Sequence, residues 1–153
     1  MSIIQSIFNT IGGVAGLFFE EPEVARYIVL AETLSGITVP HPEGANSVDF
    51  RNINAPGLIS GSFPVLFFTT RHEGRAEFSV RLNNTTLIRR YPLENGVRTW
   101  HKFIPPGALK TQYNELVLSL QSGSKGKVIF ADMFILYKSN ELTVTKPLEP
   151  SQR

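Results

Sequence analysis

Cysteine is absent from the 153 residues of this chain. A disulfide framework and a thiolate metal site are therefore both excluded. Histidine is scarce as well, and His41, His72 and His101 fall in separate segments without the spacing of paired metal ligands. The 13 acidic residues form no oxygen-rich loop of the kind that calcium prefers. We therefore expect no cofactor and no metal, and calcium has no support.

The short motifs of common enzyme classes are also missing. The sequence contains no G-x-S-x-G elbow, no H-E-x-x-H pair, no P-loop and no glycine pattern for a dinucleotide. The formal charge of +2 is too small to indicate binding to nucleic acid. These absences predict a non-catalytic protein that does not bind nucleic acid.

The N-terminal segment differs from the rest of the chain. Residues 2–19 contain no charged side chain, and their apolar residues recur at the three- and four-residue spacing of an amphipathic helix. No positive region precedes them, so there is no recognisable signal peptide. The compartment stays unknown, with a cytoplasmic protein and non-classical release as the alternatives. The segment could dock on its own domain, join a homo-oligomer or contact a membrane, although it has no Lys or Arg for anionic lipid.

The chain from Arg26 onward has the pattern of short strands separated by turn residues. Apolar and polar residues alternate cleanly in 76–82, as in a strand with one buried face, and leucines occupy every second position of 115–120. Pro, Gly and Asn clusters separate the runs, and no βαβ alternation occurs. The predicted strands are 26–32, 47–51, 57–70, 76–82, 87–91, 97–104, 115–120, 127–137 and 141–146.

This pattern predicts an all-β protein of about 8–10 antiparallel strands with a short N-terminal amphipathic helix. The predicted organisation is a helical segment over 1–22, a β-sandwich domain over 23–146 and a flexible tail over 147–153.

The order of strands and turns from about Arg75 to Tyr137 is more specific. FSVRLNNTTL is a strand, an Asn turn and a return strand, and WHKFIPPGALK is a strand that ends in a proline-rich corner. NELVLSL and GKVIFADMFILY are a core strand led by Asn and a closing strand with an internal Asp. This order resembles the galactose-binding-like jelly roll of many carbohydrate-binding modules and lectins. The resemblance implies a jelly-roll β-sandwich and a lectin-like role with a glycan or protein partner.

Two other functions remain open at this point. One is a structural subunit that oligomerises through residues 2–19, and the other is a membrane-active, toxin-like protein that uses the same residues.

Trp100 is the only tryptophan, and it stands beside His101 in a predicted strand. An exposed indole offers a flat apolar face on which a sugar ring can stack. In a domain this rich in Phe, the alternative is a Trp in the core. We predict that Trp100 and His101 contribute to ligand binding.

Two polar clusters are further candidates for binding hydroxyl or carboxylate groups. Arg89, Arg90 and Tyr91 form one group, and Arg71, His72 and Arg75 form another around Glu73. The alternative for each cluster is a solvated face.

Two further positions have structural interpretations. Asp132 lies inside an apolar run, where we expect a strand kink or a carboxylate bonded to the backbone rather than a calcium ligand. Asn83 and Asn84 begin overlapping glycosylation sequons, but we interpret them as a hairpin turn.

Overall fold

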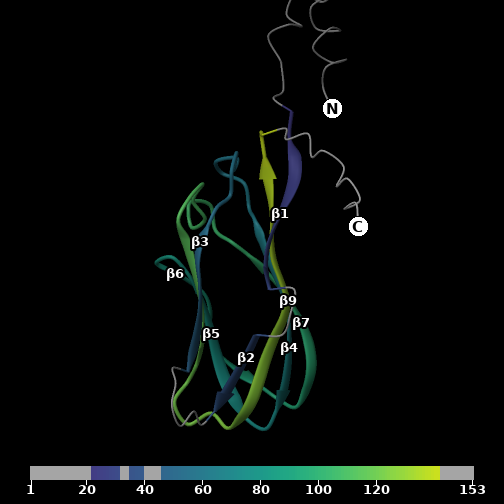
Figure 1. Cartoon of the computed structure of the whole chain (residues 1–153), viewed down its shortest axis with the longest axis vertical. Coiled ribbons are helices and arrows are strands. Elements are labelled where there is room, and N and C mark those ends of the chain that lie inside the picture. Colours follow the sequence, from purple (N-terminus) through teal and green to yellow (C-terminus); the bar gives the residue numbers. More distant parts are fainter. Residues whose placement is uncertain (1–21, 32–34, 40–45, 142–153) are drawn as a thin grey trace, which may run out of the picture.

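A computed structural model describes residues 22–31, 35–39 and 46–141. Two antiparallel sheets, which we name sheet A and sheet B, lie face to face (Figure 1). Sheet A has the order β1-β9-β4-β7, and β2 also pairs with β9. Its strands are β1 (Val24–Ala31), β2 (Ser35–Val39), β4 (Val65–Glu73), β7 (Gly96–Phe103) and β9 (Gly126–Ser139). Sheet B has the order β3-β8-β5-β6. Its strands are β3 (Ser47–Ile53), β5 (Ala76–Leu82), β6 (Thr85–Leu93) and β8 (Asn114–Leu120).

The core lies between the two sheets and is rich in aromatic rings. Phe68 of β4 meets Phe78 of β5 edge to face, with ring centroids 6.1 Å apart. Phe130 of β9 packs against both rings at 6.2 and 5.8 Å. Alternate residues of β5 and β8 are buried, as their period of two predicts. Side chains from facing strands therefore fill the interior from both sides.

The sandwich of antiparallel strands confirms the predicted fold class in its β part. Several predicted boundaries change. The run 57–70 contains turns up to residue 64 and becomes a strand only at Val65, and β2 has no counterpart among the predicted strands. The predicted N-terminal helix, the tail and nearly all of the strand over 141–146 lie outside the described residues.

Asp132 marks a bulge in β9. Its φ angle is 49°, and β9 has one extra residue between Ala131 and Phe134 relative to its partner β4. The side chain is exposed, so the strand kink expected from the sequence is present and the carboxylate avoids the cost of burial.

Asn83 and Asn114 hold one end of sheet B together. Asn83 turns the chain with a φ of 52°, and its side chain donates to the Ala108 carbonyl and accepts from the Glu115 N–H. The expected turn role of Asn83 is confirmed. The fully buried Asn114 amide donates to the carbonyls of Ile53 and Lys110 at 2.9 and 2.7 Å. Four chain segments therefore meet at this pair of amides.

Candidate functional site

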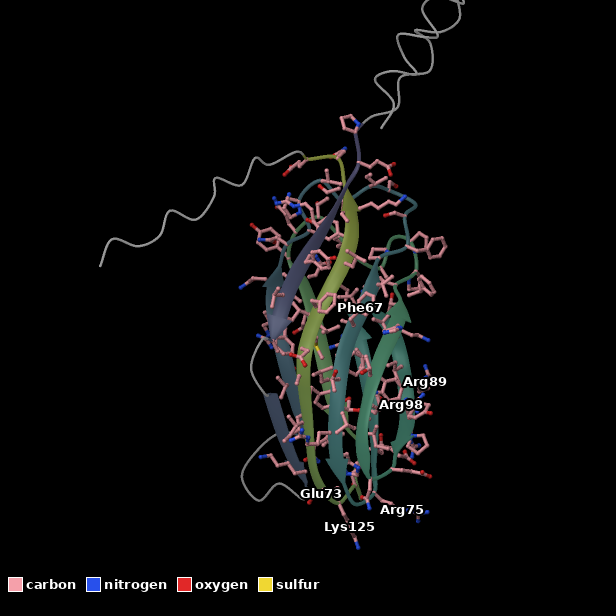
Figure 2. The ribbon with its side chains drawn as sticks, turned by 90° about the vertical axis from the view of Figure 1, so that its right-hand side faces the viewer. Phe67, Glu73, Arg75, Arg89, Arg98 and Lys125 are labelled. Atoms are coloured by element: carbon pink, nitrogen blue, oxygen red, sulfur yellow. The ribbon has the colours of Figure 1, made fainter. Side chains whose placement is uncertain are left out.

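A row of aromatic rings crosses the outer face of sheet A, the face turned away from sheet B. Tyr27 of β1 contacts Phe134 of β9 edge to face, with centroids 5.6 Å apart. Phe134 stacks on Phe67 of β4 at 4.8 Å with an interplanar angle of 14°. Phe67 in turn meets His101 of β7 at 4.8 Å. We call Tyr27, Phe134, Phe67 and His101 the aromatic row, and Figure 2 views this face with Phe67 labelled.

The pairing register explains why these rings meet. Phe67 pairs with Phe134 on one side and with His101 on the other, so all three side chains share one face of the sheet. Tyr27 pairs with Leu136, the next residue of β9 on that face after Phe134. The row therefore runs across the strands, from the edge strand β1 to the edge strand β7.

The surroundings of the aromatic row are apolar and open to solvent. Tyr27 is 64% exposed and Phe103 is 69% exposed, and Val29 is also exposed. Val65 and Leu136 lie half-buried between them, paired with Phe103 and Tyr27 respectively. A contiguous apolar patch on a protein surface is typical of interaction sites.

Polar groups follow directly beside the row. Thr69 pairs with Thr99 and with Ala131, one step further along the same face than Phe67. Arg71 follows on β4 and is exposed, and Asp132 stands in the β9 bulge two residues before Phe134. Hydroxyl, guanidinium and carboxylate groups therefore border the apolar surface on one side.

Trp100 and His101 point to opposite faces of β7. Trp100 is 8% exposed and stacks on Phe68 with centroids 5.8 Å apart. Its indole N–H donates to the Thr70 hydroxyl at 2.9 Å. Trp100 therefore lies in the core rather than as an exposed platform, whereas His101 belongs to the aromatic row.

The predicted cluster of Arg89, Arg90 and Tyr91 separates in the same way. The Arg90 Nε donates to Glu77 at 3.0 Å on the outer side of sheet B, and Arg89 is exposed. Tyr91 turns inward and meets Trp100 edge to face at 4.8 Å. An extra residue at this point of β6, where Arg90 has a φ of 44°, causes the change of direction.

Arg71, His72 and Arg75 also diverge. Arg71 lies on the outer face of sheet A, whereas His72 points inward, is 2% exposed and has its Nε2 3.3 Å from the Lys125 carbonyl oxygen. Arg75 stands in the turn after β4. It lines a hollow of about 440 Å³ together with Arg90, Glu77 and Glu94. The structure thus brings Arg75 of one predicted polar cluster and Arg90 of the other together at the end of sheet B.

The described residues contain neither a metal-binding cluster nor a membrane-spanning helix. They hold no group of three or more His, Asp or Glu side chains that could bind a metal ion. No helix within residues 22–31, 35–39 and 46–141 has the length and hydropathy required to span a bilayer.

Tyr137 of β9 has a pKa above its ordinary value. Burial raises this pKa, the Arg26 charge lowers it and the Glu141 charge adds to the rise. Its hydroxyl donates to the Pro56 carbonyl at 3.0 Å, so this tyrosine ties the C-terminal end of β9 to the loop after β3.

Three members of the aromatic row, Tyr27, Phe67 and Phe134, are absent from the residues predicted as a site. The sequence holds a signal for them, because the run from Val65 to Phe68 is apolar at every position. A strand that is apolar on both faces but belongs to a two-layer sandwich must expose one of those faces.

Comparison with known proteins supports the fold. No protein-family model matches the sequence, and no curated protein matches it. A solved structure described as "CBM4 structure and function" superposes with a TM-score of 0.50 and 15% identity, covering 72% of this chain and 76% of that one. The structure of a family two carbohydrate esterase from Cellvibrio japonicus, also 15% identical, gives a TM-score of 0.36 over 85% of this chain and 38% of that one. The first of these confirms, for the fold alone, the resemblance to jelly-roll carbohydrate-binding modules.

Proposed function

We propose that this chain is a non-catalytic, lectin-like carbohydrate-binding module that holds a glycan against the outer face of sheet A. The observation that carries the proposal is the aromatic row, in which four rings from four strands contact one another in sequence. The fold that the chain shares with a CBM4 structure agrees with this role.

The chemistry of the face suits a sugar. The C–H groups of a pyranose form an apolar surface that packs on aromatic rings, while its hydroxyl groups need hydrogen-bond partners. Tyr27, Phe67 and Phe134 supply the apolar contacts. Thr69, Thr99, Asp132 and Arg71 supply donors and acceptors along one side of the row. Because the row is continuous across the sheet, it favours an extended chain of sugars over a single unit.

The residues predicted from the sequence take different parts in this proposal. His101 is the end of the aromatic row at β7, and Arg71 borders the row on β4. Trp100 stabilises β7 from the core side without touching the ligand. Arg75 and Arg90, with Glu77 in the hollow at the end of sheet B, lie apart from this face.

The test is affinity electrophoresis and titration calorimetry with a panel of soluble polysaccharides. Phe67→Ala and Tyr27→Ala should each weaken binding about tenfold, equivalent to about 1.4 kcal/mol, because each removes one stacking surface. Tyr27 is a useful second variant, since its side chain is exposed at an edge strand and its removal should leave folding intact.

Tyr113→Ala is the matched control. Tyr113 is 77% exposed but lies in the loop before β8, away from the aromatic row. Its replacement should leave the affinity unchanged. A folded wild-type protein that binds no polysaccharide, or equal losses for Tyr27→Ala and Tyr113→Ala, would contradict the proposal.

A second candidate function is assembly through the same face. The exposure of Tyr27, Val29 and Phe103 on one sheet face is the observation in its favour. This function predicts a defined oligomer in sedimentation experiments, which Tyr27→Glu converts to monomer. A glycan ligand that binds a monomer would contradict it.

A further inference from the structure

The two strands at one edge of the sandwich carry only positive formal charge. Strand β6 ends sheet B and strand β7 ends sheet A, and neither contains an aspartate or glutamate. Together they contain Arg89, Arg90, Arg98 and Lys102. The Arg98 Nη1 donates to the Tyr91 hydroxyl at 2.6 Å, so the two edge strands meet at this contact. We call Arg89, Arg98 and Lys102 the basic edge.

Salt bridges partly neutralise several cations elsewhere on the described surface. At the opposite side of the sandwich, Arg51 of β3 pairs with Asp49 and Glu115, and Arg26 of β1 pairs with Glu141. Within the described residues, no salt bridge involves any member of the basic edge. Their charges are therefore available to a ligand.

Arg98 is held in one position by the rings around it. Its guanidinium carbon lies 4.1 Å from the centre of the Trp100 ring and 4.9 Å from that of Tyr91. Cation–π contacts and the bond to Tyr91 position a group that has five N–H donors. The side chain is exposed, so the remaining donors can form bidentate bonds to a planar anion at small cost in side-chain entropy.

The basic edge continues the path of the aromatic row. The row crosses sheet A from β1 and ends at His101 on the edge strand β7. Arg98 and Lys102 alternate with His101 along that strand, so they lie on the same side of it as Trp100, toward sheet B. Figure 2 shows Arg98 and Arg89 beside β7, on the side of Phe67 toward which the row leads. A glycan chain that passes His101 and bends over the edge strand β7 therefore reaches these cations.

We propose that the ligand of this module is an acidic glycan, whose carboxylate or sulfate groups bind at the basic edge while its sugar rings pack on the aromatic row. This inference rests on the proposed function, and it adds the substrate class. Arg98 makes the bidentate contact, and Arg89 and Lys102 supply additional attraction. Lys and Arg on edge strands also prevent edge-to-edge pairing of sheets. That role alone predicts no preference between acidic and neutral glycans.

The experiment compares polymers that share a backbone but differ in charge. The first pair is polygalacturonate and its fully methyl-esterified form, and the second is dextran sulfate and dextran. At low salt the full-length protein should bind one acidic polymer at least tenfold more tightly than its neutral counterpart. The preference should decrease as salt is raised, because exposed charges are screened. The pair that shows the preference distinguishes carboxylate from sulfate.

Three variants locate the effect. Arg98→Gln should remove most of the preference and leave affinity for the neutral polymer unchanged, and the Arg89→Gln, Lys102→Gln double variant should reduce the preference. Lys110→Gln removes one exposed positive charge from a loop outside the basic edge and should have no effect. Emission from Trp100 and the thermal midpoint report whether Arg98→Gln is folded.

Equal affinity for charged and neutral polymers, with binding that Phe67→Ala weakens, would overturn the acidic substrate class and leave the proposed function standing. An equal effect of Lys110→Gln and Arg98→Gln would overturn the assignment of the basic edge. Failure of the folded protein to bind any of the four polymers would count against both proposals.

Discussion

Replacing Asn114 with alanine tests whether its buried amide holds one end of sheet B together. The side chain donates to Ile53 and Lys110 carbonyl oxygens, and its oxygen accepts from the Lys110 N–H at 2.7 Å. The Ile53 bond is fully buried, so its carbonyl oxygen would lose a partner that water cannot replace, at a cost of about 1–3 kcal/mol. Each bond to Lys110 is only partly buried and contributes about 0.5–1.5 kcal/mol.

The expected loss in unfolding free energy is therefore about 2–6 kcal/mol. For a chain of this size, the thermal midpoint would decrease by roughly 4–24 °C. Urea unfolding followed by Trp100 emission measures the change, since this ring is the single tryptophan and is buried. Asn140→Ala is the control, because that side chain is exposed and should change stability by less than about 0.5 kcal/mol. Equal stabilities for the two variants would refute this account of Asn114.

Two further predictions concern the core. Trp100→Phe should lower the unfolding free energy by about 1–3 kcal/mol, because the Thr70 hydroxyl loses its indole donor and Arg98 loses a stacking surface. Denaturant unfolding followed by circular dichroism measures this loss of stability. An unchanged denaturation midpoint would contradict the stacked arrangement. The raised pKa of Tyr137 means that the unfolded chain ionises first, near the ordinary value of 10.0, so stability falls as pH rises from there toward the folded pKa. Tyr137→Phe should therefore reduce the fall in stability over that pH range. Urea midpoints measured between neutral and strongly alkaline pH test this for the wild-type protein and the variant. An identical slope in the two proteins would show that other groups cause the fall in stability.

The strands that bury one face were predictable from the sequence. In β5, buried Phe78 and Val80 alternate with half-buried Ser79, and the same alternation places the leucines of β8 in the core. The hairpin at Asn83 was equally accessible, since Asn tolerates the positive φ that the turn requires. These features depend on the polarity and backbone preferences of residues that are close together in the chain, and a single sequence shows both.

The aromatic row was not predictable in this way. Phe67 and Phe68 are neighbours of the same type, and only the pairing of β4 with β9 and β7 shows which of them faces outward. The contact between Tyr27 and Phe134 joins strands from opposite ends of the chain. The clusters that looked compact in sequence, such as Trp100 with His101, separated because successive strand residues point to opposite faces. A site built on a sheet face requires the long-range register, which composition and spacing do not contain.

The central position of β9 in sheet A has a consequence for how the protein is made. Sheet B is complete once residue 120 has been synthesised, and β4 can already pair with β7, but β1 and β2 wait for β9, which ends at Ser139. During synthesis a complete sheet B therefore lies beside an incomplete sheet A, so part of its apolar face is uncovered. Strand β1 must remain unpaired while nearly the whole chain follows it. A truncation within β9 would leave that intermediate permanently open, making it a substrate for chaperones and proteases rather than a smaller working domain.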